Sequence, residues 1–276
     1  MKIKNNQKLF KKLYSKSPGG VLAIRRPYNF IMGKYPTFFE SAKGSEVKDI
    51  DGNIYLDMMC GYGPIILGHR EKYIDNKVIN QIRNKGNCMT LTQPIQFELI
   101  KTVNKIFNSD KSILVKTGSD AASLSIRLAR SFTGKSKILR CGYHGWHDWC
   151  VGDKHGTPKY IQKDIIEFPY NDLNKLENLL LKFKDKVAAI IIWPIHTPLG
   201  ERVVFPNKDY LNEIKKLSVK HSAVLIFDEI RSGFRMGLAG SQSIYKVKPN
   251  LSIIGKAMAN GYPISAVTGD GNIMDQ

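Results

Sequence analysis

The chain has 276 residues, of which 42% are hydrophobic and 24% charged, and this composition is ordinary for a soluble globular protein. No apolar run approaches the roughly 18 residues that a membrane-spanning helix needs. The N-terminus is basic but lacks the apolar stretch of a signal peptide. These features favour a cytoplasmic protein without a membrane partner.

The net charge is +18, which by itself would suit an acidic partner such as nucleic acid. The lysines are nevertheless spread along the chain, in short clusters such as Lys11-Lys12 and Lys215-Lys216. Binding of nucleic acid would require clustered Lys and Arg with interleaved aromatic residues, and the sequence lacks that pattern. We therefore expect no nucleic-acid partner, although a positive field would still attract anionic ligands.

Four of the side-chain types that bind metals fall in one short segment, CGYHGWHDWC, at residues 141–150. The spacing of Cys141, His144, His147 and Cys150 resembles that of a zinc site. This short run would have to surround the ion by itself, and its two tryptophans would crowd it. We expect no metal, and we interpret the four cysteines of the chain as reduced thiols.

The predicted elements begin, after a basic N-terminal arm, with a hairpin over residues 44–57 that turns at Asp51-Gly52-Asn53. From about residue 96 the chain alternates between helices and strands. Apolar residues recur at helical spacing over residues 97–107, 121–132, 173–183 and 210–217. Continuous apolar runs predict strands at residues 112–116, 137–141, 187–193, 223–229 and 251–256. Such strands, separated by helices, predict an α/β fold with a mostly parallel sheet covered on both faces.

Three of these strands end in residues that can carry chemistry. In open α/β sheets, ligands bind outside the carboxyl ends of the strands. Gly118-Ser119 opens a helix and could bind phosphate through backbone N–H groups, although Thr117 or Ser119 could also simply cap the helix. Asp228 follows a strand of apolar residues and would need a cation there, unless it is an exposed strand-end acid. Lys256 is either a nucleophile in a partly dry pocket or one more solvated lysine.

The sequence resembles the class III (fold type I) aminotransferases that depend on pyridoxal 5′-phosphate (PLP), in particular the branch that includes glutamate-1-semialdehyde 2,1-aminomutase. The resemblance rests on the segments at residues 18–21, 49–69, 116–139, 142–146, 225–235 and 248–269, which occur in family order over nearly the whole chain. It implies the PLP-transferase fold type I. It also implies PLP as the cofactor.

The resemblance implies a role for each matching residue. Lys256 corresponds to the lysine that holds PLP as a Schiff base and shuttles a proton. Asp228 corresponds to the aspartate that pairs with the pyridine nitrogen, so both are catalytic and bind the cofactor. Gly118 and Ser119 correspond to the turn that cradles the phosphate, and Tyr143 to the aromatic residue that stacks on the ring. His144 adjoins Tyr143 without an assigned role.

The sequence departs from the aminomutase and from the wider family at several positions, which leaves the substrate open. Gly61-Tyr62 stands where the aminomutase has Ser-Trp, and Trp193-Pro194 stands where the family usually has Glu-Pro. Arg26 lies where the aminomutase has a carboxylate-binding arginine, with Arg25 beside it. Arg26 and Tyr62 are therefore the substrate candidates.

Family members continue well past the lysine into a C-terminal small domain, whereas this chain stops soon after Lys256. We expect a fragment of a longer reading frame, with little activity as it stands. The predicted domains are residues 1–45, an N-terminal arm with part of the small domain, and residues 46–276, a large PLP-binding domain incomplete at its C-terminus.

The function predicted from the resemblance is transfer of an amino group between a small-molecule amino donor and an aldehyde or keto acceptor, in a homodimer. Two alternatives stay open. The first is glutamate-1-semialdehyde 2,1-aminomutase, which makes 5-aminolevulinate. The second is a truncated, non-catalytic remnant.

Overall fold

The computed structural model describes residues 2–20, 35–87, 89–151, 156–198 and 202–276. Its contacts divide the chain into two compact units, Met1–Cys88 and Met89–Gln276. This division falls after the hairpin, whereas the domain boundary predicted from the resemblance falls at residues 45 and 46. The predicted boundary refers to the domains of the longer family fold, and it stays a prediction.

The N-terminal unit is built on a three-stranded antiparallel sheet. Its elements are α1 (Lys4–Tyr14), η1 (Pro18–Gly20), β1 (Phe39–Lys43), β2 (Glu46–Asp49), β3 (Ile54–Leu56) and α2 (Lys72–Lys85). The predicted hairpin is confirmed as β2 and β3. The buried carboxylate of Asp49 stabilises its turn, because Oδ1 accepts hydrogen bonds from the backbone N–H groups of Asp51 at 3.0 Å and Asn53 at 2.8 Å.

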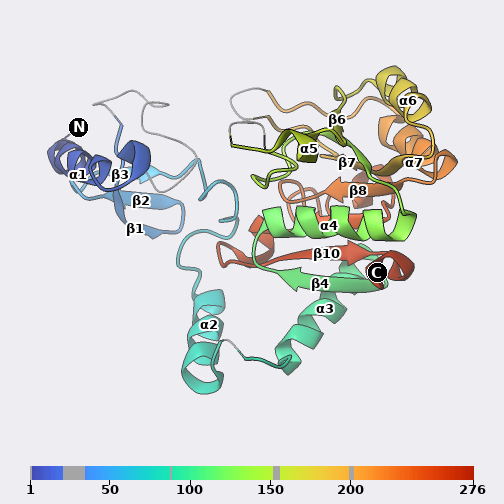
Figure 1. The fold of residues 1–276 in the computed structure, drawn as a ribbon. Helices are drawn as coiled ribbons and strands as arrows, with labels where there is room; N and C mark the ends of the chain where they lie inside the picture. The colour runs from blue at the N-terminus through green and yellow to red at the C-terminus, as the bar shows by residue number, and fades with distance from the viewer. Residues whose placement is uncertain (1, 21–34, 88, 152–155, 199–201) are drawn as a thin grey trace. The chain divides into compact units, whose positions relative to one another are not determined.

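The C-terminal unit contains a seven-stranded sheet with the order β4-β10-β9-β8-β7-β5-β6 (Figure 1). Its strands are β4 (Lys111–Val115), β5 (Lys137–Cys141), β6 (Ile165–Glu167), β7 (Val187–Ile192), β8 (Val224–Asp228), β9 (Leu251–Ile254) and β10 (Ser265–Gly269). The pairs from β6 through β9 are parallel, and β10 runs antiparallel to both of its neighbours. The mostly parallel sheet predicted from the apolar runs is therefore confirmed.

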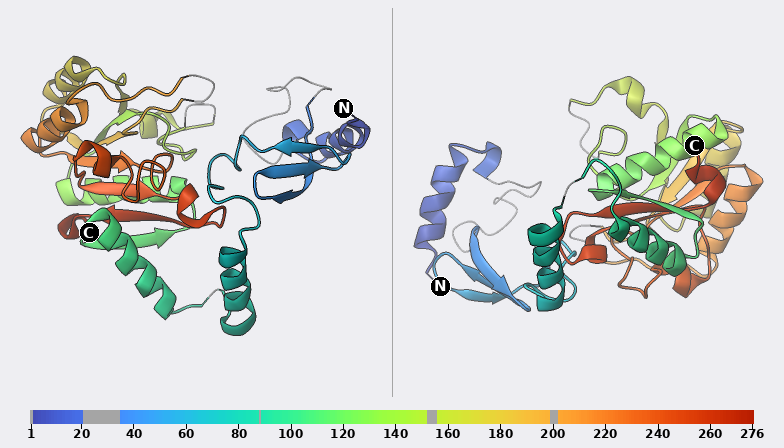
Figure 2. Two further views of the ribbon diagram at one scale, coloured as in Figure 1. Left: turned by 180° about the vertical axis from the view of Figure 1, so that it is seen from behind. Right: turned by 90° about the horizontal axis from the view of Figure 1, so that it is seen from below.

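Helices cover both faces of this sheet, which explains why its central strands are apolar throughout. The helices are α3 (Pro94–Phe107), α4 (Gly118–Thr133), α5 (Lys159–Gln162), α6 (Leu173–Lys182), α7 (Tyr210–Lys220), α8 (Ser241–Tyr245) and α9 (Gly271–Met274), with the short η3 (Lys256–Ala259). In β7, Ala189 and Ile191 face the core cluster under α4, while Ile190 and Ile192 face the cluster under α6 and α7. The view from behind shows α3 beside β4 and β10, where Phe107 packs against Ile254 and Ala266 (Figure 2).

The strand directions bring six carboxyl ends to one edge of the sheet. β4 and β9 each pair antiparallel with β10, so they run in the same direction. β5, β6, β7 and β8 run parallel to β9. The loops that follow β4, β5, β7, β8 and β9 therefore meet at this edge, where open α/β sheets bind ligands.

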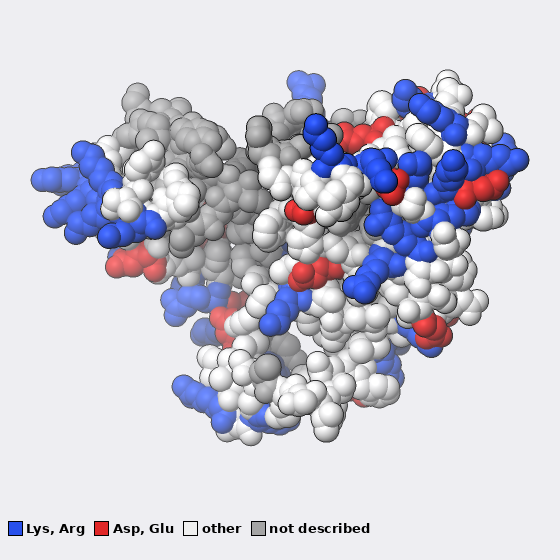
Figure 3. All heavy atoms as spheres, viewed as in Figure 1, with Lys and Arg blue, Asp and Glu red and all other residues white. Residues whose placement is uncertain are grey.

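On the face drawn in Figure 3, Lys and Arg side chains are spread over several elements and interspersed with Asp and Glu. Among the helices that the structure describes, none combines the length and the apolar character that crossing a membrane requires.

Candidate active site

The loops at this edge enclose a cavity of ≈ 180 Å³ within the C-terminal unit. Its lining residues follow β4, β5, β7, β8 and β9, and they are Gly118, Ser119, Tyr143, His144, Gly145, Trp193, Asp228, Ile230, Arg231 and Lys256. The structure thus brings the five cofactor-binding candidates of the sequence analysis, which are separated by up to 138 positions (256 − 118), around one space.

The phosphate-binding candidates form the first turn of α4. Thr117 caps this helix in a reciprocal arrangement: Asp120 N–H donates to Thr117 Oγ1 at 3.1 Å, and Thr117 N–H donates to Asp120 Oδ2 at 3.1 Å. Of the two possible caps, Thr117 is therefore the one observed. Gly118 and Ser119 line the cavity at the positive end of a 16-residue helix, where backbone N–H groups bind anions.

The glycines at this end of the cavity allow close packing of the neighbouring loop. A Cβ atom on Gly145, whose φ is +116°, would lie 2.6 Å from Ser119 Oγ. Ser119 Oγ also accepts a hydrogen bond from Trp146 N–H at 3.4 Å. The loop after β5 therefore rests directly on the start of α4 and closes one side of the cavity.

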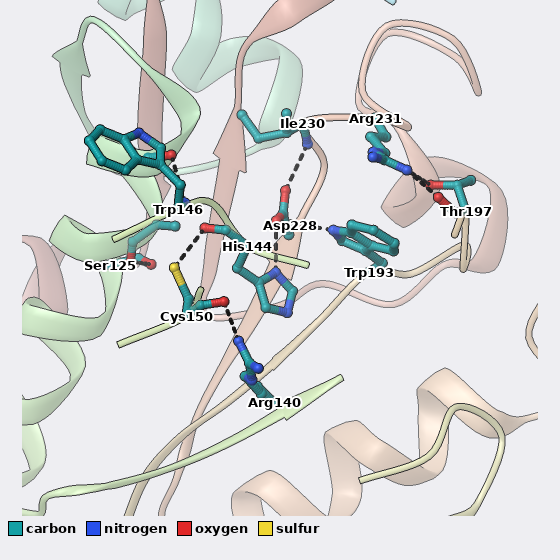
Figure 4. Close-up of polar contacts among 12 residues, drawn as sticks. Ser125, Arg140, His144, Trp146, Cys150, Trp193, Thr197, Asp228, Ile230 and Arg231 are labelled. Carbon is teal, nitrogen blue, oxygen red and sulfur yellow. Dashed lines mark hydrogen bonds and ion pairs between the residues drawn. The ribbon is translucent and has the colours of Figure 1, made fainter. Parts of the chain in front are cut away.

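Asp228 ends β8 with its side chain buried inside the protein and fully hydrogen-bonded on one oxygen. Oδ2 accepts from His144 Nδ1 at 2.8 Å and from Trp193 Nε1 at 3.2 Å, while Oδ1 accepts from Ile230 N–H at 3.1 Å (Figure 4). Because Asp228 also lines the cavity, its carboxylate presents negative charge to whatever the cavity holds. The alternative of an exposed strand-end acid is wrong, since Asp228 is only 3% exposed.

Lys256 begins η3 at the end of β9, in the left-handed backbone conformation with φ 46°. Such strained positions in non-glycine residues concentrate at functional sites. Burial lowers the pKa of the Lys256 amine, and the positive charges of Arg231 and Arg235 lower it further, although Asp228 opposes the shift. A larger fraction of this amine is neutral, and hence nucleophilic, than of an ordinary surface lysine.

Trp193 and Arg231 form a wall on the β7 side of the cavity. The guanidinium carbon of Arg231 lies 4.5 Å from the centroid of the Trp193 ring. Arg231 Nη1 donates hydrogen bonds to the carbonyl and the hydroxyl of Thr197. Gly142 makes room for the indole, because a Cβ at this position would lie 2.8 Å from Trp193 Cδ2. In the sequence, Trp193 stands out only as a departure from the family pattern, and Arg231 is not among the predicted site residues.

A second cavity of ≈ 340 Å³ shares this wall with the first. Tyr143, Trp193 and Arg231 line both cavities. The remaining walls come from the ends of β5, β6 and β7, and they include the buried Arg140, which forms an ion pair with Glu167.

The four metal-type side chains of residues 141–150 make other contacts. His144 pairs with Asp228, His147 Nδ1 bonds Ser123 Oγ at 2.7 Å, and Cys150 Sγ donates to two backbone carbonyls. Cys141 is buried in the apolar cluster under α6 and α7. Within the described part of the chain, no three His, Cys, Asp or Glu side chains are grouped as ligands of a metal ion. Burial raises the pKa of the Cys141 and Cys150 thiols to about 12, so both are protonated near neutral pH.

The two substrate candidates lie elsewhere. Arg26 falls outside the described residues. Tyr62 belongs to the N-terminal unit, in the turn after β3, with 44% of its surface exposed. Their roles stay predictions.

The family model for class III aminotransferases matches residues 31–276. The chain belongs to the class III aminotransferases. It is 52% identical over 270 residues to 3-aminobutyryl-CoA aminotransferase of Cloacimonas acidaminovorans, covering 98% of this chain and 65% of that protein. It is 32% identical to glutamate-1-semialdehyde 2,1-aminomutase of Archaeoglobus fulgidus, covering 100% of this chain and 68% of the relative.

Solved structures place the chain in the same fold. The FumI protein of Sphingopyxis sp. MTA144, solved with PLP, superposes with a TM-score of 0.92 at 29% identity, over 98% of this chain and 66% of that one. A transaminase with PLP bound superposes with a TM-score of 0.90 at 22% identity, over 99% of this chain and 66% of that one. The predicted PLP-transferase fold type I is confirmed, and the chain spans about two thirds of the length of these proteins.

Class III aminotransferases use PLP, and the cavity has the chemistry that this cofactor needs. The start of α4 suits a phosphate, the buried carboxylate of Asp228 suits a protonated pyridine nitrogen, and the Lys256 amine suits an aldehyde carbon. The three groups line the same space, so the residues present fit PLP.

Proposed function

We propose that this chain is the cofactor-binding part of a PLP-dependent aminotransferase, which moves an amino group between a small-molecule amino donor and a keto or aldehyde acceptor. The observation that carries this proposal is the placement of a lysine of lowered pKa and a buried carboxylate around one cavity at a helix N-terminus. Membership in the class III family supports the same reaction class.

In this proposal, different residues bind different parts of the cofactor. Gly118 and Ser119 hold the phosphate through the N-terminus of α4. Asp228 holds the pyridine nitrogen in its protonated form, and His144 and Trp193 keep the carboxylate oriented through their hydrogen bonds to Oδ2. Tyr143 covers the ring from the loop after β5. When bound, PLP supplies an electron sink for negative charge on the substrate carbon.

Lys256 is the proposed covalent anchor and proton carrier. Its amine would hold the cofactor covalently and would be released when the amine of a substrate takes its place. The free amine of Lys256 then lies in the cavity with a lowered pKa, which suits it to take a proton from the substrate carbon and to return it. Without Lys256 the chain would lose both the anchor and the base.

The proposed substrate class is a 3-aminoacyl thioester of coenzyme A. The support is the 52% identity to 3-aminobutyryl-CoA aminotransferase, well above the 32–35% identity to the aminomutases. The net charge of +18 agrees with this class, because a positive field attracts the phosphates of coenzyme A.

Two further properties belong to this proposal. We expect a cytoplasmic homodimer, as the resemblance to fold type I enzymes implies. Exposed apolar side chains in the N-terminal unit, with Ile54 and Leu56 each 64% and Met58 80% exposed, agree with a surface that is covered in an assembly. The alternative of a non-catalytic remnant predicts cofactor binding without turnover.

The test supplies purified protein with PLP and compares the wild type with two variants. Because little activity is expected of this chain, we expect slow amino transfer from 3-aminobutyryl-CoA to a keto acid, no transfer with K256A, and the wild-type rate with the control K182A, which lies on the exposed face of α6. Conversion of glutamate-1-semialdehyde to 5-aminolevulinate instead would favour the aminomutase. A PLP-loaded protein that turns over neither compound would support the remnant.

A further inference from the structure

The second cavity has no part in the cofactor chemistry described above, yet it opens from the same wall. The first cavity is lined by the groups that would hold PLP. The second cavity, of ≈ 340 Å³, lies next to it. A volume of this size is in the range of small-molecule sites, which begin at about 300 Å³. The residues of the shared wall therefore face both the cofactor and anything bound in the second cavity.

Arg231 is the cationic member of this wall, and it is held in a defined orientation. One of its faces stacks on Trp193 at 4.5 Å, and Nη1 is anchored to Thr197. Trp193 is itself held by its bond to Asp228 (Figure 4). A planar guanidinium held in this way presents its N–H groups in a fixed plane, which suits it to bind an oxygen acceptor.

The same guanidinium lies on the cavity that holds the reacting amine, because Arg231 and Lys256 both line the first cavity. In a 3-aminoacyl compound, one methylene separates the carbon that bears the amine from the acyl carbon. A substrate whose amine carbon lies at Lys256 would therefore place its acyl oxygen only a few ångströms away. Arg231 lines both cavities and places a positively charged donor at their boundary, where that oxygen would lie.

The other residues that line the second cavity suit the pantetheine arm of a coenzyme A thioester. Phe168, Trp193 and Pro198 provide apolar surface, and the Arg140–Glu167 pair provides polar groups. A pantetheine arm has the same mixture, with methyl and methylene groups between amides. A free 3-amino acid, which ends at its carboxylate, would leave this space unused.

We propose that Arg231 is a specificity-determining residue that binds the acyl oxygen of a 3-aminoacyl thioester, and that the second cavity receives the adjoining arm. This inference rests on the proposed function, since it assumes that the amine reacts at Lys256. It adds the residue and the space that select the thioester.

The experiment measures binding of butyryl-CoA to the PLP-loaded protein by calorimetry. Butyryl-CoA has the acyl group and the arm but no amine, so it binds without reacting. We expect R231Q to weaken this binding by at least about tenfold, because it removes a charged donor to the acyl oxygen. R231K keeps the charge but loses the planar fork, so we expect it to retain PLP and still bind butyryl-CoA less tightly.

The control is R127Q, which removes one positive charge from the exposed face of α4 and should change the affinity by less than about twofold. Equal affinity of the wild type and both Arg231 variants would overturn the proposal. Binding of butyrate as tight as that of butyryl-CoA would also overturn it, because the arm would then contribute nothing.

This test separates the inference from the proposed function. The binding measurement does not depend on turnover, so a protein that binds butyryl-CoA through Arg231 but fails in a separate assay to transfer an amino group contradicts the proposed function alone. A protein that transfers the amino group of 3-aminobutyryl-CoA with the same KM in the wild type, R231Q and R231K contradicts the inference alone.

Discussion

Asp228 and Glu229 are adjacent carboxylates at the end of β8, and their environments differ sharply. Asp228 lines the cofactor cavity and accepts hydrogen bonds from two aromatic ring N–H groups. Glu229 is fully buried and accepts from the backbone N–H of Ser241 at 2.9 Å and from the hydroxyls of Ser232 and Ser241. One carboxylate is therefore available to a ligand, while the other holds together the loop that carries Arg231 and Arg235.

Replacing Asp228 with Asn tests the first role. The amide has nearly the same shape but carries no negative charge, so it cannot stabilise a protonated pyridine nitrogen. We expect the Kd for PLP to rise about ten- to a hundredfold, as for the loss of one hydrogen bond to a charged group, with a large fall in turnover. Fluorescence titration with PLP measures the affinity. Asp164→Asn, which removes a carboxylate that pairs with Lys137, is the control and should leave PLP binding unchanged.

The pH dependence of stability tests the second role. Burial raises the pKa of Glu229 to about 7, and its hydrogen bonds only partly oppose that shift. A raised folded-state pKa gives stability that is present below the unfolded value near 4.5 and is lost as pH rises through about 7. Ionisation of Glu229 would thus cost up to about 3 kcal/mol.

The measurement compares wild type with Glu229→Gln in urea unfolding between pH 5 and pH 8.5. We expect the free energy of unfolding of the wild type to fall relative to the variant across that range. If the free energy of unfolding changes with pH in the same way for both proteins, Glu229 does not titrate between pH 5 and pH 8.5.

At the scale of elements, the start of α4 combines a structural cap with a ligand site. Thr117 and Asp120 satisfy each other's backbone N–H groups, which leaves the helix end ordered where Gly118 and Ser119 line the cavity. We expect Thr117→Ala to lower the free energy of unfolding by about 1 kcal/mol and to weaken PLP binding, because the first turn frays. Thr133→Ala, in the last turn of α4, is the control and should leave PLP affinity unchanged. If Thr117→Ala also leaves the PLP affinity unchanged, the Thr117 cap does not contribute to PLP binding.

The loop after β5 depends on a glycine at residue 142. Gly142 has φ +111°, and an added Cβ would lie 2.8 Å from Trp193 Cδ2. Gly134 also has positive φ, at +67°, but has nothing within 4 Å of an added Cβ. We expect Gly134→Ala to cost about 1 kcal/mol from the backbone and Gly142→Ala to cost about 1–3 kcal/mol more from overpacking. Thermal unfolding of both variants checks the difference, and equal costs would mean that Trp193 moves aside freely.

Apolar periodicity predicted the longer elements of the C-terminal unit to within three residues, because the central strands are buried on two faces and each long helix on one. It missed β6 and β10. β6 has only two apolar residues, and β10 is composed mostly of small or polar residues whose burial comes from their neighbours β4 and β9. Strands with so few large apolar residues take their structure from the sheet around them rather than from their own pattern.

For the whole molecule, PLP should act as a folding ligand of the C-terminal unit. The cavity draws on loops after five strands, so a bound cofactor connects segments that are far apart in the chain. PLP at a hundred times its Kd should raise the free energy of unfolding by about 2.7 kcal/mol through mass action. Calorimetric scans with and without PLP measure this shift. We expect a smaller shift for Lys256→Ala, which removes the proposed covalent anchor, and an equal shift would argue against Lys256 in that role.

The sequence by itself determined the class of fold and the candidate cofactor residues. Apolar runs and helical spacing are local properties, and the carboxyl ends of parallel strands always meet at one edge. Gly118, Asp228 and Lys256 could therefore be grouped from their places after strands. The resemblance to class III aminotransferases named the cofactor from the same segments.

Only the tertiary structure decided which side chains surround these residues. His144 and Asp228 are 84 positions apart, and Trp193 and Asp228 are 35 positions apart, so neither hydrogen bond has a local signal. The order of the strands places the loops after β5 and β7 beside the one after β8, and this order creates both the wall of Trp193 and Arg231 and the second cavity behind it. Cavities and long-range hydrogen bonds arise from packing between elements, and packing depends on the strand order that local patterns leave open.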